Sequence, residues 1–270
     1  KQFISNKDYY FCVFLKRIKI NYNMKYKIYL EYNGTNYAGW QQQKNAKTVQ
    51  GTLIDTIKTI FKNSKGESKF IDLQGSGRTD RGVHAVEQVA HLECETMLAP
   101  EILKQKMNDI LSSDINILEI EKTYDRFHAR HSAQSRQYVY KISKRRTAFE
   151  KRYVWWVKDE LDVERMQQAG EMFVGMNNFK SFSEKSDEDK STLVKVESVE
   201  ITEDADKIYV RIKSSHFLWK MVRRLVGVLV EVGRGNFNRS DIELLLKEYS
   251  EEPAKYTAPP SGLFLEKIYY

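Results

Sequence analysis

The chain has few cysteines and no long hydrophobic run. Two cysteines, Cys12 and Cys94, cannot form a disulfide framework or a four-thiolate metal site. Such low cysteine usage is typical of the reducing cytoplasm. The apolar stretch Tyr9–Leu15 is too short to cross a bilayer, and no small-residue cleavage site follows it. We therefore expect a cytoplasmic protein without a membrane partner.

Several catalytic and cofactor-binding patterns are also missing. Gly75-Ser76-Gly77 begins like a dinucleotide fingerprint, but Asp80 stands where the third glycine is needed, and no Gly-Lys-Ser/Thr follows for a phosphate-binding loop. His91-Leu92-Glu93 has the H-x-E form of zinc deaminases without the P-C-x-x-C that completes their site. The sequence contains no H-E-x-x-H and no G-x-S-x-G. We therefore expect neither a catalytic metal nor serine hydrolysis.

The composition is that of a globular chain rather than a disordered one. The 270 residues are 41% hydrophobic and 30% charged, with a mean hydropathy of −0.59, and this length suggests one large or two modest domains. Residues 1–23 show no clear pattern, and we treat them as an N-terminal extension of unknown status. The remainder divides into an N-terminal α+β half, 24–133, and a C-terminal α+β half, 134–270.

Hydrophobic periodicity predicts helices and strands in mixed order. One helix is predicted to begin after the N-cap candidate Thr48. Four more are predicted at Pro100–Leu111, Val163–Val174, Phe217–Val232 and Ile242–Glu248. The first predicted strand begins at Lys25. The other predicted strands are Lys69–Leu73, Val86–Leu92, Ile115–Ile120, Gln137–Ser143, Leu193–Ile201, Ile208–Lys213 and Leu263–Tyr269. Ser183–Ser191 is predicted to be a surface loop. There is no alternating βαβ rhythm and no repeat, so we expect an α+β fold with antiparallel sheets.

Positive charge is concentrated in two segments. The net charge of +7 decides little by itself, because many enzymes are equally basic. Arg126–Arg152 holds nine basic residues and one acidic residue, and Arg211–Arg239 holds seven and one, so the rest of the chain is acidic overall. Aromatic residues such as Tyr138 and Phe149 lie among the cations of the first segment. Cations neutralise phosphates and rings stack on bases, so these segments favour a nucleic acid partner over a merely solvated basic surface.

The segment Gln74–Ala85, QGSGRTDRGVHA, is the sharpest local feature. It follows a predicted strand, and its three glycines allow a tight loop with the backbone close to a ligand. Asp80 lies between Arg78 and Arg81, and an adjacent guanidinium would lower its pKa by about one to three units and keep it ionised. On spacing alone two interpretations stay open: a functional carboxylate, or an Asx turn ahead of Gly82, which is slightly favoured.

Five further motifs accompany this loop in a fixed order. They are YAGWQQQ (37–43) with TVQ (48–50), FHAR (127–130) with RQYVY (136–140), FKSFS (179–183), FLWKMVRRLVG (217–227) with VGRG (232–235), and APPSGL (258–263). Together with GRTD (77–80) and GVHA (82–85), they resemble the TruA family of tRNA pseudouridine synthases. The resemblance extends from about Met24 to Tyr270, and the order of six motifs makes it specific.

The resemblance implies a pseudouridine synthase fold, in which two similar α+β halves join their antiparallel sheets into one continuous sheet with a basic cleft between them. It implies a homodimer that binds tRNA and converts uridine to pseudouridine in the anticodon stem-loop, at tRNA positions 38, 39 and 40, with no metal or organic cofactor. Asp80 falls on the catalytic aspartate, and Tyr138 on the tyrosine that stacks on the target base. Arg223 falls on the basic residue that pairs with the aspartate, and Arg78 on the arginine that helps to displace the flipped nucleotide.

Two departures affect how the family pattern transfers. Arg81 stands where the family generally has alanine, so a different set of uridines could fit. Arg224 follows Arg223 directly, and helical spacing leaves open which arginine faces the carboxylate, although the MVR motif (221–223) favours Arg223. Two other functions stay open: a synthase of the same fold with a different RNA target, and a tRNA-binding protein without catalysis. Retention of the aspartate, the tyrosine and the arginine together argues against the second.

Overall fold

The structure is a computed structural model that describes residues 23–64, 66–184 and 191–270. Its strands are β1 (Asn23–Tyr32), β2 (Lys69–Gly75), β3 (His84–Glu95), β4 (Ile115–Lys122), β5 (Ser135–Ser143), β6 (Trp155–Trp156), β7 (Gly175–Asn178), β8 (Leu193–Glu203), β9 (Lys207–Ser214) and β10 (Leu263–Tyr269). Its helices are α2 (Val49–Asn63), α3 (Pro100–Ile110), α4 (Val163–Glu171), α5 (Met221–Gly233), α6 (Arg239–Lys247) and α7 (Glu252–Lys255), with short 3-10 helices η1 (Gly34–Asn36), η2 (Lys180–Phe182) and η3 (Pro260–Gly262).

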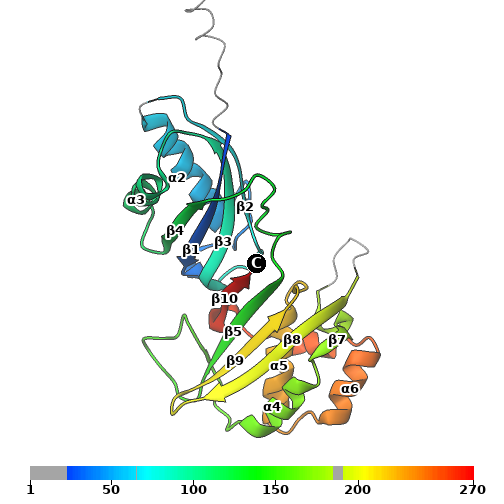
Figure 1. Cartoon of the computed structure of the whole chain (residues 1–270). Coiled ribbons are helices and arrows are strands. Elements are labelled where there is room, and N and C mark those ends of the chain that lie inside the picture. Colours follow the sequence, from blue (N-terminus) through cyan, green and yellow to red (C-terminus); the bar gives the residue numbers. More distant parts are fainter. Residues whose placement is uncertain (1–22, 65, 185–190) are drawn as a thin grey trace, which may run out of the picture.

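One continuous sheet connects all of these strands. Its path is β4-β1-β3-β10-β5-β9-β8-β7, with β2 paired to β3 and β6 paired to β5. Helices α2 and α3 lie beside one end of the sheet, and α4, α5 and α6 lie beside the other (Figure 1). The expected α+β fold with joined sheets is confirmed.

The two ends of the sheet meet at β10. This strand pairs antiparallel with β5, where Leu265 lies opposite Tyr138, and parallel with β3, where Phe264 lies opposite His84. Most other pairings in the described residues are antiparallel as predicted, so the junction makes the sheet mixed. Because β10 lies between β3 and β5, it sets the relative placement of the two halves (Figure 1).

Helix α2 shows how local sequence fixes an element beside the site. The side chain of Thr48 accepts a hydrogen bond from the backbone N–H of Gly51, which confirms the predicted N-cap. Leu53 and Ile57 on its inner face are fully buried. The indole of Trp40, just before this helix, is also buried and lies against Gly75, where an added Cβ would come within 2.6 Å of the ring. A side chain at that glycine would therefore push β2 away from Trp40.

Helix α5 is the central helix of the other half and is buried on almost every side. Its Gly227 lies directly against the backbone of Tyr256, since a Cβ at this glycine would lie 1.6 Å from the Tyr256 carbonyl oxygen. The prediction that this helix begins at Phe217 is wrong. The helix begins at Met221, because Lys220 adopts a left-handed conformation with φ of 60° and breaks the helical path.

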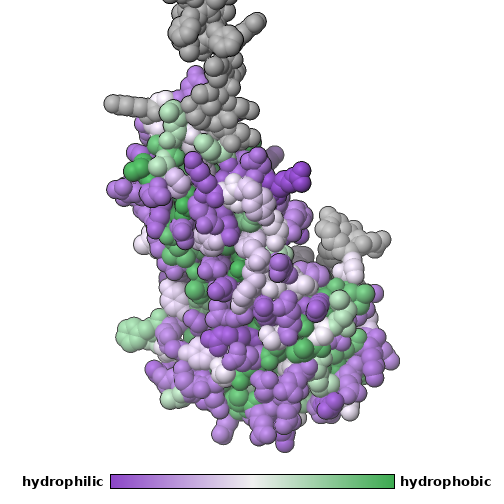
Figure 2. All heavy atoms as spheres, in the orientation of Figure 1, coloured by the Kyte–Doolittle hydropathy of each residue, from purple (hydrophilic) through white to green (hydrophobic). Residues whose placement is uncertain are grey.

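The visible surface is largely hydrophilic, with smaller hydrophobic areas in both the upper and the lower part of the view (Figure 2). In the described part of the chain, no helix is both long and apolar enough to cross a membrane. The predicted extension 1–23 and its stretch Tyr9–Leu15 fall outside the described residues, apart from Asn23, and so does most of the predicted loop Ser183–Ser191.

Candidate active site

A cleft opens where the two ends of the sheet meet. Its walls come from the loop after β2, the segment before α2, strand β5, and residues 216–223 at the start of α5. The cleft has a volume of about 2100 Å³, whereas small-molecule pockets usually have volumes of roughly 300–1,000 Å³. It therefore has room for part of a macromolecule.

The glycine-rich loop between β2 and β3 carries Asp80 into this cleft. The backbone N–H of Trp40 donates to the carbonyl of Thr79 at 3.0 Å, and the Thr79 hydroxyl bonds to the hydroxyl of Tyr32 at 2.8 Å. Gly82 has φ of +78°, in the region where glycine is favoured. Buried residues of the core thus hold the loop, and Asp80 projects from a rigid support.

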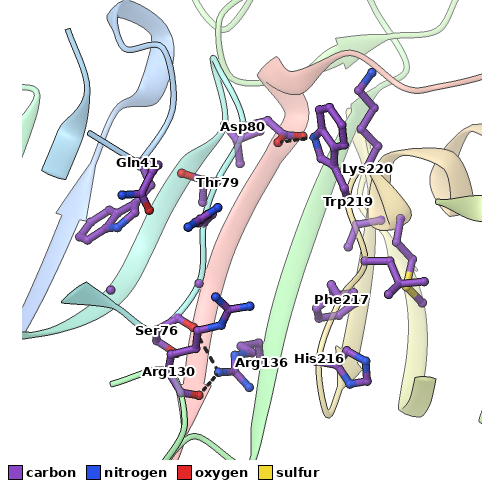
Figure 3. Close-up of a pocket in the computed structure, with 18 of the residues that line it drawn as sticks. Gln41, Ser76, Thr79, Asp80, Arg130, Arg136, His216, Phe217, Trp219 and Lys220 are labelled. Atoms are coloured by element: carbon purple, nitrogen blue, oxygen red, sulfur yellow. Dashed lines mark hydrogen bonds between the residues drawn. The ribbon is translucent and has the colours of Figure 1, made fainter. Parts of the chain in front are cut away.

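The carboxylate of Asp80 faces the opposite wall of the cleft. Its Oδ1 accepts a hydrogen bond from Nε1 of Trp219 at 3.1 Å, and its Oδ2 lies 3.8 Å from Nη1 of Arg223. The turn of its own loop is closed by a backbone bond instead, from the N–H of Val83 to the carbonyl of Asp80 at 3.1 Å. The side chain is therefore directed across the cleft rather than into an Asx turn ahead of Gly82 (Figure 3).

Burial and the neighbouring side chains determine the pKa of Asp80. Burial raises the pKa of Asp80 above its ordinary value of 3.8, while the charge of Arg223 and the hydrogen bond from Trp219 lower it without cancelling the effect of burial. The prediction that Arg78 and Arg81 would lower this pKa is wrong, because both side chains are exposed and the carboxylate faces Arg223.

The two consecutive arginines of α5 have different partners. Arg223 donates from Nε to the carbonyl of Ala258 at 2.6 Å, and its Nη1 lies on the side of Asp80. Arg224 instead pairs with the carboxylate of Glu184 at 2.6 Å and donates to the carbonyl of Ser183. The structure therefore brings Arg223 to the carboxylate, the alternative favoured by the motif, and occupies Arg224 elsewhere.

Tyr138 and Arg78 both line the same cleft. Tyr138 comes from β5 and is 8% exposed, with its ring edge-on to Phe217 at a centroid distance of 5.0 Å. Burial raises the pKa of its hydroxyl well above the ordinary value, so the side chain is neutral. Arg78 is exposed on the glycine-rich loop, two residues before Asp80.

The two basic segments do not face the cleft as a whole. Arg130 and Arg136 of the first segment and Lys220 and Arg223 of the second line it. Other cations of these segments are engaged in ion pairs with acidic residues, namely Lys144 with Glu203, Arg145 with Asp206, Arg211 with Glu266 and Lys213 with Glu197. Only part of each basic segment therefore lines the cleft, and contact with RNA stays a prediction.

The sequence did not predict the contacts of two side chains in the cleft. Trp219 contacts Asp80 directly, but it lies in a stretch that was predicted to be helical. Arg136 donates to the carbonyls of Ser76 at 3.1 Å and Arg130 at 2.6 Å and so fastens the glycine-rich loop to the segment before β5 (Figure 3). Both residues lie inside the motifs that resemble the family, and this was the only sign in the sequence that they belong to the cleft.

The described residues contain no cluster of three or more histidine, cysteine, aspartate or glutamate side chains that could hold a metal ion. Cys94 is buried in β3 with a free thiol, and burial raises the pKa of that thiol to about 12. The side chains that line the cleft include acidic, basic and aromatic ones.

Comparison with known proteins identifies the family. A family model described as tRNA pseudouridine synthase matches residues 28–132 and 169–270. A protein named tRNA pseudouridine synthase A from Thermoanaerobacter sp. (strain X514) is 38% identical over 245 residues, which cover 90% of this chain and 98% of that protein. Proteins of the same name from Thermodesulfovibrio yellowstonii and Bartonella tribocorum are 34% and 36% identical over 256 and 251 residues, covering 90% and 91% of this chain and 98% and 99% of theirs. The chain belongs to the TruA family of tRNA pseudouridine synthases, which are isomerases.

Proposed function

We propose that this chain converts uridine to pseudouridine in the anticodon stem-loop of tRNA, at positions 38, 39 and 40, with Asp80 as the catalytic carboxylate. The observation that carries the proposal is the position of Asp80, which projects into a macromolecule-sized cleft and faces Arg223 on the opposite wall. The glycine-rich loop is held by the buried core, so the carboxylate is presented in a defined place.

The chemistry requires few groups. The N1–C1′ bond breaks, the uracil turns and a C5–C1′ bond forms, while C5 loses a proton and N1 gains one, so the composition of the nucleotide is unchanged. Glycoside hydrolysis needs two carboxylates and a water, whereas this isomerisation adds no water and one carboxylate suffices. Asp80 could attack C1′, add to C6 of the base or remove a proton from the sugar, and every route begins from the ionised carboxylate.

The environment of Asp80 suits this role. Burial leaves the carboxylate poorly solvated, which raises its pKa and makes it a stronger base or nucleophile once it is ionised. Arg223 supplies a positive charge 3.8 Å away that favours the ionised form. Asp80 is thus reactive and still able to ionise.

The target base must leave its stack to reach Asp80. Unstacking costs a few kcal/mol, and stacking on an aromatic ring returns about 1–3 kcal/mol. We assign that ring to Tyr138 on β5 and assign displacement of the nucleotide to the exposed Arg78. Arg130 and Arg136 further along the cleft would neutralise phosphates.

We further propose that the protein acts in the cytoplasm as a homodimer, with the halves 24–133 and 134–270 each forming one wall of the cleft. The homodimer rests on the family resemblance, and light scattering of the purified protein tests it. A monomeric mass at the concentrations used for activity would contradict it.

Mapping of pseudouridine in tRNA incubated with the purified protein tests the reaction and its target together. We expect new pseudouridines in the anticodon arm with the unaltered protein and none with Asp80→Asn, while tRNA binding stays largely intact. Pseudouridine in another part of tRNA, or in another RNA, would contradict the target but keep the reaction. An active Asn variant would contradict the assignment of Asp80.

A further inference from the structure

Trp219 reaches across the cleft to the candidate catalytic carboxylate. Its indole Nε1 donates to Oδ1 of Asp80 at 3.1 Å, between two segments that are 139 residues apart (Figure 3). The indole is about half exposed, at 53%, so it forms part of the cleft surface rather than of the core. The two carboxylate oxygens therefore have different partners, since Oδ2 lies beside Arg223.

The backbone of Trp219 is fixed from both sides. Its carbonyl accepts a hydrogen bond from the N–H of Glu184 at 3.0 Å. The next residue, Lys220, has φ of 60° and ψ of 4° and pairs with Glu184 at 3.2 Å. A left-handed conformation is uncommon in a residue other than glycine, and it persists where surrounding contacts hold it, often at functional sites. Lys220 thus holds an unfavourable backbone conformation directly after Trp219, where the backbone sets the direction of the indole.

A hydrogen bond to a carboxylate has two effects that bear on catalysis. It holds the side chain in one orientation, and it stabilises the ionised form. The other charged groups that face Asp80 act with opposite signs: Arg223 and Lys220 favour the ionised carboxylate, and Glu184 opposes it. Tyr138 on β5 is neutral. Trp219 is an uncharged donor, so it can orient the carboxylate without adding a charge that would compete for phosphate.

We propose that Trp219 is a positioning residue for Asp80, whose indole N–H holds Oδ1 so that Oδ2, beside Arg223, is the oxygen presented to the nucleotide. This inference rests on the proposed catalytic role of Asp80. The indole remains hydrogen-bonded while the nucleotide enters, so loss of the donor affects the chemical step more than RNA binding.

Two substitutions separate the donor from the ring. Trp219→Phe keeps an aromatic ring without the N–H. Trp219→His keeps a donor, because the imidazole overlays the five-membered part of indole and places Nε2 where Nε1 of tryptophan lies. We expect Trp219→Phe to lower kcat about tenfold, the effect of one hydrogen bond to a charged group, with KM for tRNA nearly unchanged. The acidic limb of its pH–rate profile should move upward by about one pH unit. Trp219→His should restore most of both.

Three results would overturn the proposal. The first is a Phe variant with the kcat and acidic limb of the unaltered protein. The second is a Phe variant that reacts faster, which would mean that the indole obstructs the nucleotide. The third is an equal loss in the Phe and His variants with no shift of the acidic limb, which would indicate packing alone.

A measurement on the free protein keeps this test separate from the proposed function. The sequence has four tryptophans, so ¹⁵N-tryptophan labelling gives few indole signals, and Trp219→Phe assigns the one of interest. We expect that signal to shift as Asp80 titrates and to lose this pH dependence in Asp80→Asn. A Trp219 indole signal whose pH dependence is the same in Asp80→Asn would overturn the positioning role. If the coupling is present but Asp80→Asn stays active, the proposed function fails instead.

Discussion

Asp80 lies where its negative charge is poorly solvated, although the proposed reaction needs that charge. Burial raises its pKa, and the partners that offset this effect, Arg223 and Trp219, come from a distant part of the chain. The ionised carboxylate therefore costs the free protein stability, and the proposed reaction would make use of it. Such a conflict between function and stability is common at active sites, where a group is held for chemistry rather than for folding.

Replacement of Asp80 by asparagine should stabilise the free protein at neutral pH. The folded-state pKa of Asp80 lies above its ordinary value of 3.8, so Asp80 binds a proton more tightly in the folded protein than in the unfolded chain. The stability from this group is fully present below the unfolded-state pKa and is lost as the pH rises through the folded-state pKa. Urea unfolding should therefore show Asp80→Asn to be the more stable protein at pH 7, with the difference vanishing near pH 3.8 and below.

A matched control uses the same change of charge on an exposed helix. Asp55→Asn on α2 removes one carboxylate from the surface, where substitutions usually change stability by less than about 0.5 kcal/mol. If Asp80→Asn were no more stable than the unaltered protein at pH 7, the ionised carboxylate would not be disfavoured by folding.

Tyr138 should act through its ring rather than its hydroxyl. The side chain is buried and neutral, and its ring packs edge-on against Phe217. Tyr138→Phe keeps the stacking surface, so we expect kcat/KM within about threefold of the unaltered protein. Tyr138→Leu removes it and should cost about 1–3 kcal/mol of transition-state stabilisation, measured from kcat/KM. A large loss in the Phe variant would show that the hydroxyl takes part in chemistry.

At the scale of elements, α5 is the helix that brings Arg223 to Asp80 in the cleft. Its apolar run made the helix predictable from sequence, and the MVR motif indicated which arginine faces Asp80. Its first turn was not predictable, because the break at Lys220 depends on contacts with Glu184 that are distant in sequence. The same distance in sequence explains why the contact of Trp219 with Asp80 was not predicted. Spacing alone pointed to Arg78 and Arg81 as the cations near Asp80, whereas the family resemblance pointed to Arg223.

Gly227 is the point at which α5 tolerates no side chain. A Cβ there would lie 1.6 Å from the carbonyl oxygen of Tyr256, so Gly227→Ala must displace either the helix or the segment after α7. We expect a loss of about 3 kcal/mol in the free energy of unfolding, although alanine by itself favours a helix by about 1 kcal/mol. Gly77→Ala is the control, since nothing lies within 4 Å of its added Cβ. Equal stability of the two variants in thermal or urea unfolding would contradict this close contact.

At the scale of the whole molecule, most strands and the joining of the two sheets were predicted, but not which strands pair at the junction. The bounds of β10 agree with the predicted strand Leu263–Tyr269. Its parallel pairing with β3 was not predicted, because hydropathy along a strand does not identify partners far away in the chain. The distribution of charge had the same limit: sequence located the basic segments, and only the fold shows which cations line the cleft and which pair with carboxylates.

Arg136 should be a structural link between the two sides of the cleft. Its guanidinium donates to the carbonyls of Ser76, Arg130 and Ser215, which belong to three different segments. Arg136→Met should lower the free energy of unfolding by about 3 kcal/mol, because hydrogen bonds from a charged donor are lost and the part-buried carbonyls of Ser76 and Ser215 lose a partner.

Arg130→Met is the matched control, since Arg130 is an exposed cation that lines the same cleft. We expect it to weaken RNA binding and to reduce the salt dependence of binding by about one ion, with little change in urea unfolding. A Met variant of Arg136 that unfolds like the Arg130 variant would mean that Arg136 acts only as another phosphate contact.

The position of β10 has a consequence for protein synthesis. Phe264 pairs with His84 on one side and Val139 on the other, so the strand that unites the sheet leaves the ribosome after both of its neighbours. Until then Asp80 and Arg223 lie in parts of the growing chain that β10 has not yet joined. The pairing of β10 with β3 spans many residues, and such long-range pairings form slowly. A nascent chain would thus not complete the cleft between its two walls until β10 has been synthesised and has paired with β3 and β5.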